Sequence, residues 1–169
     1  MRFAILGAGA LGTILGAHLS RAGHEVAMIV RGERARVLQR QGLVLNGLSD
    51  IKARPTVIDD PQKLRETGTL IIATKAIDSM QALETLRHVR VDNAFSVQNG
   101  VLKNELLARV YGFSRVLGAM ADFSGELLAN GEVKFTRNVA LHLGEEKGGV
   151  SPRVISRTSG SPGTICGIC

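Results

Sequence analysis

Aromatic side chains are scarce in this chain of 169 residues, which has no Trp and a single Tyr. The net charge is +6, and half of it comes from Lys147, Arg153 and Arg157 near the C-terminus. A nucleic-acid-binding face needs clustered basic residues and aromatic side chains that stack on bases. The composition therefore argues against nucleic acid as a partner and suits a small anionic cofactor and substrate.

Cysteine and long apolar segments are equally sparse. Both cysteines, Cys166 and Cys169, lie at the extreme C-terminus. No βαβ context there supports a redox pair, and no second ligand pair completes a zinc site. The chain has no run of 18 apolar residues and no charged-then-apolar leader before its first strand. We therefore expect a cytoplasmic protein with no bound metal and no membrane contact.

Glycine, in contrast, is abundant, and three glycines follow a short apolar strand predicted at 3–6. In a strand–turn–helix unit, Gly7 permits the tight turn, Gly9 lets a diphosphate approach the backbone, and Gly12 lets the helix lie close to its strand. The free N–H groups and the dipole at the start of that helix attract the same diphosphate. The predicted diphosphate-binding residues are Gly7, Ala8, Gly9, Ala10, Leu11 and Gly12.

The residue that ends the second strand distinguishes NAD from NADP. That strand, predicted at 24–30, closes a βαβ unit, which favours a nucleotide site over a glycine-rich turn without a ligand. NAD sites place a carboxylate there for the ribose 2′-OH, whereas a 2′-phosphate needs a guanidinium. Arg31 stands at this position, so we predict NADP as the cofactor. We interpret the nearby Arg34 and Arg36 as solvated surface charges.

Further apolar segments complete an alternating pattern of strands and helices. Continuous apolar strands are predicted at 69–74 and 94–97, and helices at 33–40, 78–89 and 103–111. This alternation predicts an α/β fold with a Rossmann-type doubly wound parallel sheet.

The pattern changes after residue 115, where strands follow one another without helices. Strands are predicted at 116–120, 132–136 and 139–143, with turns at 130–131 and 137–138. They predict a small antiparallel edge on the parallel sheet.

The last segment of the chain differs from the rest in composition. Of the 23 residues at 147–169, 13 are Gly, Ser, Pro or Thr, and no apolar periodicity continues. We predict a dinucleotide-binding domain over 1–146 and a disordered or loosely attached tail over 147–169. The abrupt change is typical of a shifted reading frame or a premature end.

Two polar residues follow predicted parallel strands, where the ligands of open α/β sheets bind. Lys75 follows the strand at 69–74 and can donate to a ribose hydroxyl or to a substrate carboxylate. Asn99 follows the strand at 94–97 and offers both a donor and an acceptor to a nicotinamide or substrate carbonyl. A solvated lysine and an Asn-Gly turn are equally good interpretations of the two.

The sequences GAGALG at 7–12, ATKA at 73–76 and QNG at 98–100, together with Arg31, resemble the amino-terminal domain of the ketopantoate reductase (2-dehydropantoate 2-reductase) family. The resemblance extends from Met1 to about Gly144. It implies NADPH-dependent reduction of a small 2-oxo acid, 2-dehydropantoate, to pantoate in pantothenate biosynthesis. It also implies that the glycine turn holds the pyrophosphate, Arg31 the 2′-phosphate, Lys75 the nicotinamide-side ribose, and Asn99 the nicotinamide and substrate, so that Lys75 and Asn99 are the catalytic residues.

The resemblance also implies a helical second domain that supplies a general-acid lysine, and we expect this chain to lack that domain. A face that packs on that domain would be exposed, so we expect a possible homo-oligomer through it. Two alternatives stay open: a cofactor-binding module without turnover, and another Rossmann dehydrogenase that acts on a small 2-oxo acid.

Overall fold

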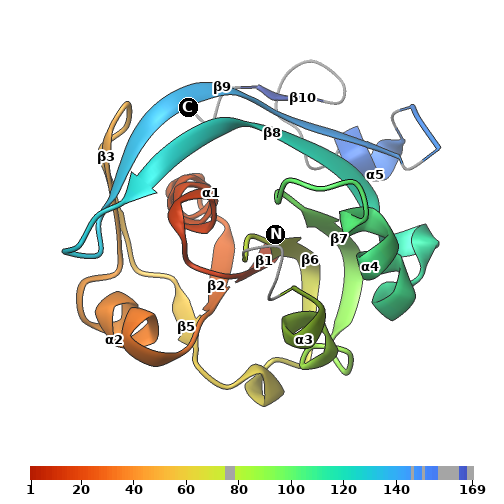
Figure 1. Ribbon diagram of the computed structural model, residues 1–169, viewed down its shortest axis with the longest axis horizontal. Helices are drawn as coiled ribbons and strands as arrows, with labels where there is room; N and C mark the ends of the chain where they lie inside the picture. Colours follow the sequence, from red (N-terminus) through yellow and green to blue (C-terminus); the bar gives the residue numbers. More distant parts are fainter. Residues whose placement is uncertain (75–78, 146, 150, 156–163, 167–169) are drawn as a thin grey trace.

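Five parallel strands form the central sheet of this computed structural model, which describes residues 1–74, 79–145, 147–149, 151–155 and 164–166 (Figure 1). The strand order is β5-β2-β1-β6-β7, and every pairing between neighbours is parallel. The strands are β1 (Arg2–Leu6), β2 (Glu25–Ile29), β5 (Thr56–Ile58), β6 (Glu66–Ile72) and β7 (Arg90–Ser96). The predicted doubly wound α/β fold is confirmed.

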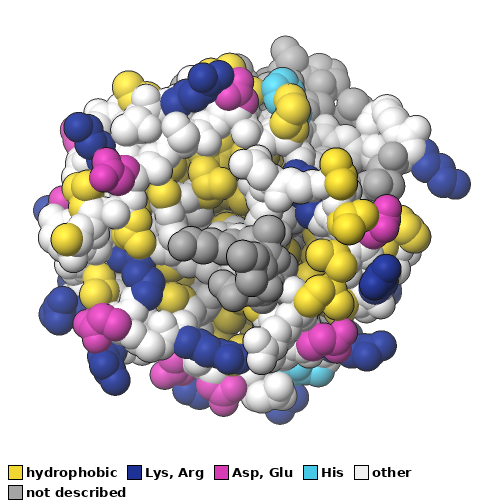
Figure 2. All heavy atoms as spheres, viewed as in Figure 1, with side chains coloured by type: hydrophobic (Ala, Val, Ile, Leu, Met, Phe, Trp, Pro, Cys, Tyr) yellow, Lys and Arg dark blue, Asp and Glu magenta, His cyan; other side chains and the backbone are white. Residues whose placement is uncertain are grey.

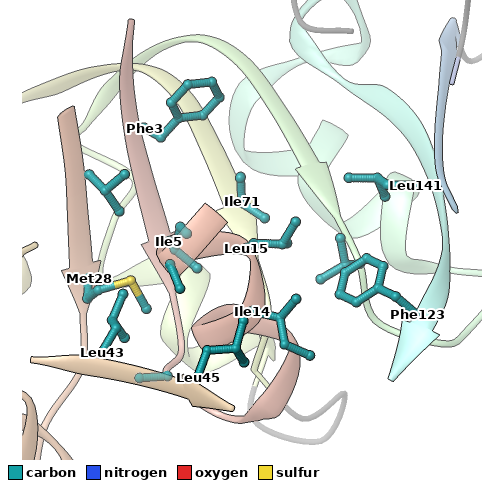
Figure 3. Close-up of a cluster of buried hydrophobic side chains, with 14 of the residues drawn as sticks. Phe3, Ile5, Ile14, Leu15, Met28, Leu43, Leu45, Ile71, Phe123 and Leu141 are labelled. Carbon is teal, nitrogen blue, oxygen red and sulfur yellow. The ribbon is translucent and has the colours of Figure 1, made fainter. Parts of the chain in front are cut away.

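Helices cover both faces of this sheet. The longer ones are α1 (Ala10–Arg21), α2 (Gly32–Gln41), α3 (Ser79–Glu84) and α4 (Lys103–Tyr111). The shorter ones are η1 (Pro61–Lys63), η3 (Phe113–Arg115) and α5 (Pro152–Ile155). On one face, Ile14 and Leu15 of α1 pack in one buried cluster with Ile5 of β1 (Figure 3). On the other face, Leu83 of α3 and Leu107 of α4 belong to a second buried cluster.

A second sheet lies over α1, so that this helix is enclosed between two sheets (Figure 1). Its strands are β3 (Leu43–Gly47), β4 (Ile51–Ala53), β8 (Leu117–Leu127), β9 (Val133–Glu145) and β10 (Thr164–Cys166). Their order is β10-β9-β3-β4, with β8 paired to β9. A parallel bridge between Ala94 and Val116 connects the start of β8 to the edge of the parallel sheet. The predicted antiparallel strands therefore belong to a larger mixed sheet, which joins the parallel sheet at the start of β8.

Two elements differ from the sequence-based predictions. The helix expected at 78–89 ends at Glu84, and the chain continues in turns that still bury Leu86 and Val89. The turn expected at 137–138 is wrong, because β9 runs through it as one strand. There Arg137 pairs with Asp122 across the strands at 2.8 Å, and the pairing with β8 shifts register after Asp122.

Small residues let α1 fit between the two sheets. A Cβ on Gly16 would lie 2.9 Å from side-chain atoms of both Leu43 and Met28. The helix is buried almost all round, and its buried residues run without interruption from Gly12 to His18. This enclosure fixes the direction in which the N-terminal end of α1 points.

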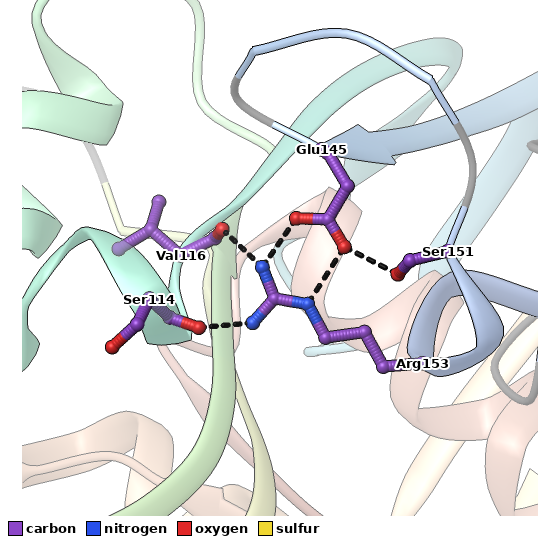
Figure 4. Close-up of polar contacts among 5 residues, drawn as sticks. All are labelled: Ser114, Val116, Glu145, Ser151 and Arg153. Atoms are coloured by element: carbon purple, nitrogen blue, oxygen red, sulfur yellow. Dashed lines mark hydrogen bonds and ion pairs between the residues drawn. The ribbon is translucent and has the colours of Figure 1, made fainter.

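The segment after β9 contacts the end of that strand through Arg153. The Arg153 guanidinium pairs with the Glu145 carboxylate and donates to the carbonyls of Ser114 and Val116 (Figure 4). Hydrogen bonding from Arg153, and then from Ser151, lowers the pKa of Glu145 to about 2. The division of the chain at residue 146 and the disorder of the tail stay predictions.

His18 is the one titratable side chain in the enclosed part of α1. Its ring lies edge-on to Phe135 of β9, with 5.7 Å between ring centroids, and Nη2 of Arg21 lies 3.2 Å from its Nδ1. Burial, and secondarily the charge of Arg21, lowers the pKa of His18 to about 4. Below pH 6.5 the unfolded chain therefore binds a proton that the folded chain does not bind until about pH 4.

We expect this difference to make the protein less stable as the pH falls from 6.5 towards 4. The free energy of unfolding, measured in urea at pH 7 and pH 5, should fall less on acidification in His18→Gln than in the unsubstituted protein. His88→Gln is the control because His88 is exposed, and it should behave like the unsubstituted protein. An equal fall in His18→Gln and its parent would contradict a buried, neutral His18.

Candidate functional site

The carboxyl ends of the parallel strands lie together along one edge of the central sheet. The residue after each strand extends the ladder: Gly7 donates its N–H to the Ile29 carbonyl at 3.0 Å, and Ala73 donates to Leu6 at 2.8 Å. The polar groups that follow β1, β2, β6 and β7 are therefore neighbours in space. This is the edge where open α/β sheets bind ligands.

The turn from β1 into α1 depends on two of its glycines for close backbone packing. Gly7 has φ +101°, a conformation that side chains rarely permit, and a Cβ there would lie 2.9 Å from the Thr74 nitrogen. A Cβ on Gly12 would lie 2.1 Å from the Gly7 carbonyl oxygen. Both positions therefore require glycine for the protein's own packing.

Position 9, in contrast, does not require glycine for packing. Its φ is −72°, and among the residues that the structure describes no atom beyond its chain neighbours lies within 4 Å of the place where its Cβ would be. The open space adjoins the first turn of α1, whose N–H groups have no acceptor within the helix. That first turn contains no acidic residue. The turn thus offers hydrogen-bond donors and the positive end of a helix dipole to an anionic group that fits beside Gly9.

The other predicted site residues lie at the same edge. Arg31 is the second residue after β2, separated from that strand by Val30. It is exposed and stands immediately before α2. Asn99 is exposed two residues beyond Val97, whose N–H donates to the Ile72 carbonyl at 3.0 Å. Lys75 lies outside the described residues. The structure therefore brings the glycine turn, Arg31 and Asn99 to one edge of the sheet.

The prediction that Arg34 is a solvated surface charge is wrong. It is half-buried, and its Nε donates to the Ala8 carbonyl at 2.8 Å. Its Nη1 donates to the Gly131 carbonyl at 2.6 Å, and its Nη2 donates to Thr13 Oγ1 at 3.0 Å. Burial lowers its pKa. Arg36 is exposed and pairs with Glu33 at 3.0 Å, as a surface charge does.

A second network holds the ends of β6 and β7 together beside Asn99. The Gln98 side-chain amide donates to the Thr74 carbonyl and, at 3.0 Å, to its hydroxyl. The Lys103 ammonium donates to the Gln98 carbonyl at 3.0 Å and to the Ala119 carbonyl of β8 at 2.6 Å. Burial lowers the pKa of Lys103. The backbone immediately before Asn99 is thereby held by hydrogen bonds.

The sequence does contain a pattern that indicates the half-buried positions of Arg34 and Lys103. Arg34 stands four residues before Leu38, and Lys103 stands four residues before Leu107; both leucines are buried. Residues four apart lie on the same face of a helix. A basic residue four positions before a buried leucine at the start of a helix therefore lies on the core-facing side of that helix.

Other kinds of site find no support in the part of the chain that the structure describes. No three His, Cys, Asp or Glu side chains lie close enough there to hold a metal ion. None of the helices in that part combines the length and apolar character needed to cross a bilayer.

A parallel sheet with helices on both faces and a glycine turn at its carboxyl edge defines a Rossmann-type domain. The family model "Ketopantoate reductase PanE/ApbA" matches residues 3–148. The chain belongs to this ketopantoate reductase family.

Relatives and solved structures agree with this assignment. A 2-dehydropantoate 2-reductase of Archaeoglobus fulgidus is 30% identical over 150 residues, which cover 89% of this chain and 49% of that protein. A 2-dehydropantoate 2-reductase of Geobacter metallireducens superposes with a TM-score of 0.82 at 25% identity, covering 94% of this chain and 54% of that one. A PanE/ApbA family ketopantoate reductase of Ralstonia eutropha gives a TM-score of 0.78 at 26% identity, with 88% and 51% covered. The chain spans about half the length of the curated relatives it matches.

The contrast between Gly9 and Gly12 gives a test of the turn. We expect Gly12→Ala to lower the melting temperature strongly, because its Cβ would collide with the Gly7 carbonyl. Gly9→Ala should melt close to the unsubstituted protein, because its Cβ enters open space at an ordinary φ. Thermal denaturation followed by circular dichroism measures both. Equal destabilisation by the two substitutions would contradict the open space at Gly9.

Proposed function

We propose that this chain binds NADP(H) along the carboxyl edge of the central sheet. The observation that carries the proposal is the glycine turn: packing explains Gly7 and Gly12, whereas the described residues leave the space beside Gly9 open at the start of α1. A diphosphate fits the donors and the dipole that meet there. The exposed guanidinium of Arg31, at the end of β2, favours a 2′-phosphate over a 2′-OH.

The remaining site residues take their proposed roles from the family. Gly7, Gly9 and Gly12, with the residues between them, hold the diphosphate and Arg31 the 2′-phosphate. Lys75 holds the nicotinamide-side ribose, and Asn99 holds the nicotinamide and the substrate. When bound, NADPH supplies the hydride that reduces a ketone. Asn99 would orient the substrate carbonyl through its amide N–H groups, next to Gln98, whose carbonyl accepts from Lys103 and whose side chain donates to Thr74.

The substrate that we propose is a small 2-oxo acid, and within the family it is 2-dehydropantoate. Its reduction gives pantoate, a precursor in pantothenate biosynthesis, and we place this reaction in the cytoplasm. Support comes from the family match over 3–148 and from curated relatives that carry the name 2-dehydropantoate 2-reductase.

A cofactor-binding module without turnover is the second candidate for the 169 residues taken by themselves. Reduction of a ketone needs a proton as the alkoxide forms, and general-acid assistance contributes about 10² to 10⁴ in rate. In the family this proton comes from a lysine of the second domain. For the 169-residue polypeptide alone we therefore propose NADPH binding with slow turnover or none.

Self-association is a further part of the proposal. Large apolar side chains are exposed at both ends of α4, among them Val101, Leu102 and Phe113. Figure 2 shows apolar side chains gathered on the side of the molecule where α4 lies. Burial of such a patch against a second copy would remove it from water.

Arg31→Ala tests the choice of cofactor. We expect it to weaken NADPH binding by roughly 1.5 to 3 kcal/mol, because a charge-assisted contact with the 2′-phosphate is lost. NADH binding should change little. Fluorescence titration of both nucleotides measures the two affinities, and an equal loss for both would contradict the preference for NADP.

Turnover separates the two candidate functions. The purified chain is mixed with NADPH and 2-dehydropantoate, and the loss of NADPH absorbance is followed beside a binding titration. Binding without oxidation supports the module, and oxidation that depends on 2-dehydropantoate supports the reductase. Gly9→Ala is the matched variant: we expect it to fold and to lose NADPH binding, because its methyl group occupies the space proposed for the diphosphate. Absence of binding in the unsubstituted chain would contradict both candidates.

A further inference from the structure

Arg34 makes three hydrogen bonds that join three separate parts of the fold. Its acceptors are the Ala8 carbonyl in the glycine turn, the Thr13 hydroxyl on α1 and the Gly131 carbonyl between β8 and β9. The Thr13 hydroxyl in turn donates to the Ala8 carbonyl at 3.4 Å. All three acceptors of the guanidinium are neutral, so its charge is not cancelled by them.

The contact with Ala8 determines the direction of a neighbouring N–H group. The peptide between Ala8 and Gly9 is trans and planar, so its N–H points opposite to its C=O. Because Arg34 holds the Ala8 oxygen on its own side, the Gly9 N–H must point away from Arg34. Among the described side chains, the other contact with the Ala8 oxygen is the longer one from the Thr13 hydroxyl, at 3.4 Å, and Gly9 has no Cβ to restrict rotation of this peptide.

The hairpin between β8 and β9 supports Arg34 from outside. Gly131 has φ +84°, and a Cβ there would lie 2.6 Å from Val37 and 3.1 Å from Arg34 Nη1. The Gln41 side chain donates to the Asn130 carbonyl at 3.3 Å, which adds a contact between α2 and the same turn. The second sheet thus holds the guanidinium against the glycine turn.

We propose that Arg34 is a positioning residue for the nucleotide: it fixes the Ala8–Gly9 peptide plane so that the Gly9 N–H faces the diphosphate. This inference rests on the proposed function, since it assigns a ligand to that N–H. It gives Arg34 a role different from that of Arg31, because a diphosphate is common to NADPH and NADH whereas the 2′-phosphate is not.

Arg34→Gln tests the proposal by titration with NADPH and with NADH. If the peptide keeps the productive orientation only about a tenth of the time, affinity falls about tenfold. We expect this loss to be the same for both nucleotides. Arg36→Gln is the matched control, because it removes the same charge from the same helix at an exposed position. It should leave both affinities within about twofold of the unsubstituted protein.

Three results would overturn the proposal. Arg34→Gln could bind both nucleotides as the unsubstituted protein does, it could lose NADPH alone, or Arg36→Gln could lose as much affinity. Loss of NADPH alone would mean that Arg34 contacts the 2′-phosphate directly. If Arg34→Gln does not fold, Arg34→Lys takes its place with the same outcomes, since an ammonium keeps the charge without the three-way contact.

A spectroscopic measurement without nucleotide separates this inference from the proposed function. The amide resonance of Gly9 in the ligand-free protein should move far more in Arg34→Gln than in Arg36→Gln, because only the first releases the peptide plane. An unmoved Gly9 resonance would overturn the role of Arg34 even if the protein binds NADPH. A protein that binds neither nucleotide would overturn the proposed function, while the Gly9 resonance still reports on the peptide.

Discussion

The close approach of α1 to the turn that follows β1 is the constraint on which the candidate site depends. Gly12 allows it, because a Cβ at that position would lie 2.1 Å from the Gly7 carbonyl oxygen. The helix is then enclosed between the parallel sheet and the second sheet, so its N-terminal end cannot turn away from the strand ends. A helix that only rested on an open sheet would leave its first-turn N–H groups less well directed.

Two half-buried cations hold the loops at the same edge of the sheet in place. Arg34, at the start of α2, joins the glycine turn to the hairpin between β8 and β9. Lys103, at the start of α4, joins the Gln98 carbonyl to β8. Both donate to neutral oxygens, and each has a backbone carbonyl of the β8–β9 part of the second sheet among its acceptors. The second sheet therefore stabilises the candidate site as well as covering α1.

Much of the parallel sheet could be predicted from the sequence, because its strands are continuous apolar runs and its glycine turn stands between a strand and a helix of one βαβ unit. The second sheet could not, since a mixed sheet folded over a helix depends on pairings between distant strands such as β3 and β9. The sequence-based interpretation of Arg34 was wrong because its partners are two backbone carbonyls and a hydroxyl, one of them 97 positions away. Such distant partners cannot be predicted from a local pattern of residue types. The spacing of four residues between Arg34 and Leu38 indicates only which face of the helix Arg34 lies on.

The most direct test of the central claim is a titration of the ligand-free protein with NADPH, followed by the backbone amide resonances. We expect the largest shifts at Gly9, Ala10 and Leu11, with a further shift at Arg31, since these residues are proposed to contact the phosphates. Shifts confined to the opposite edge of the sheet, or no shifts at saturating NADPH, would contradict nucleotide binding at the glycine turn.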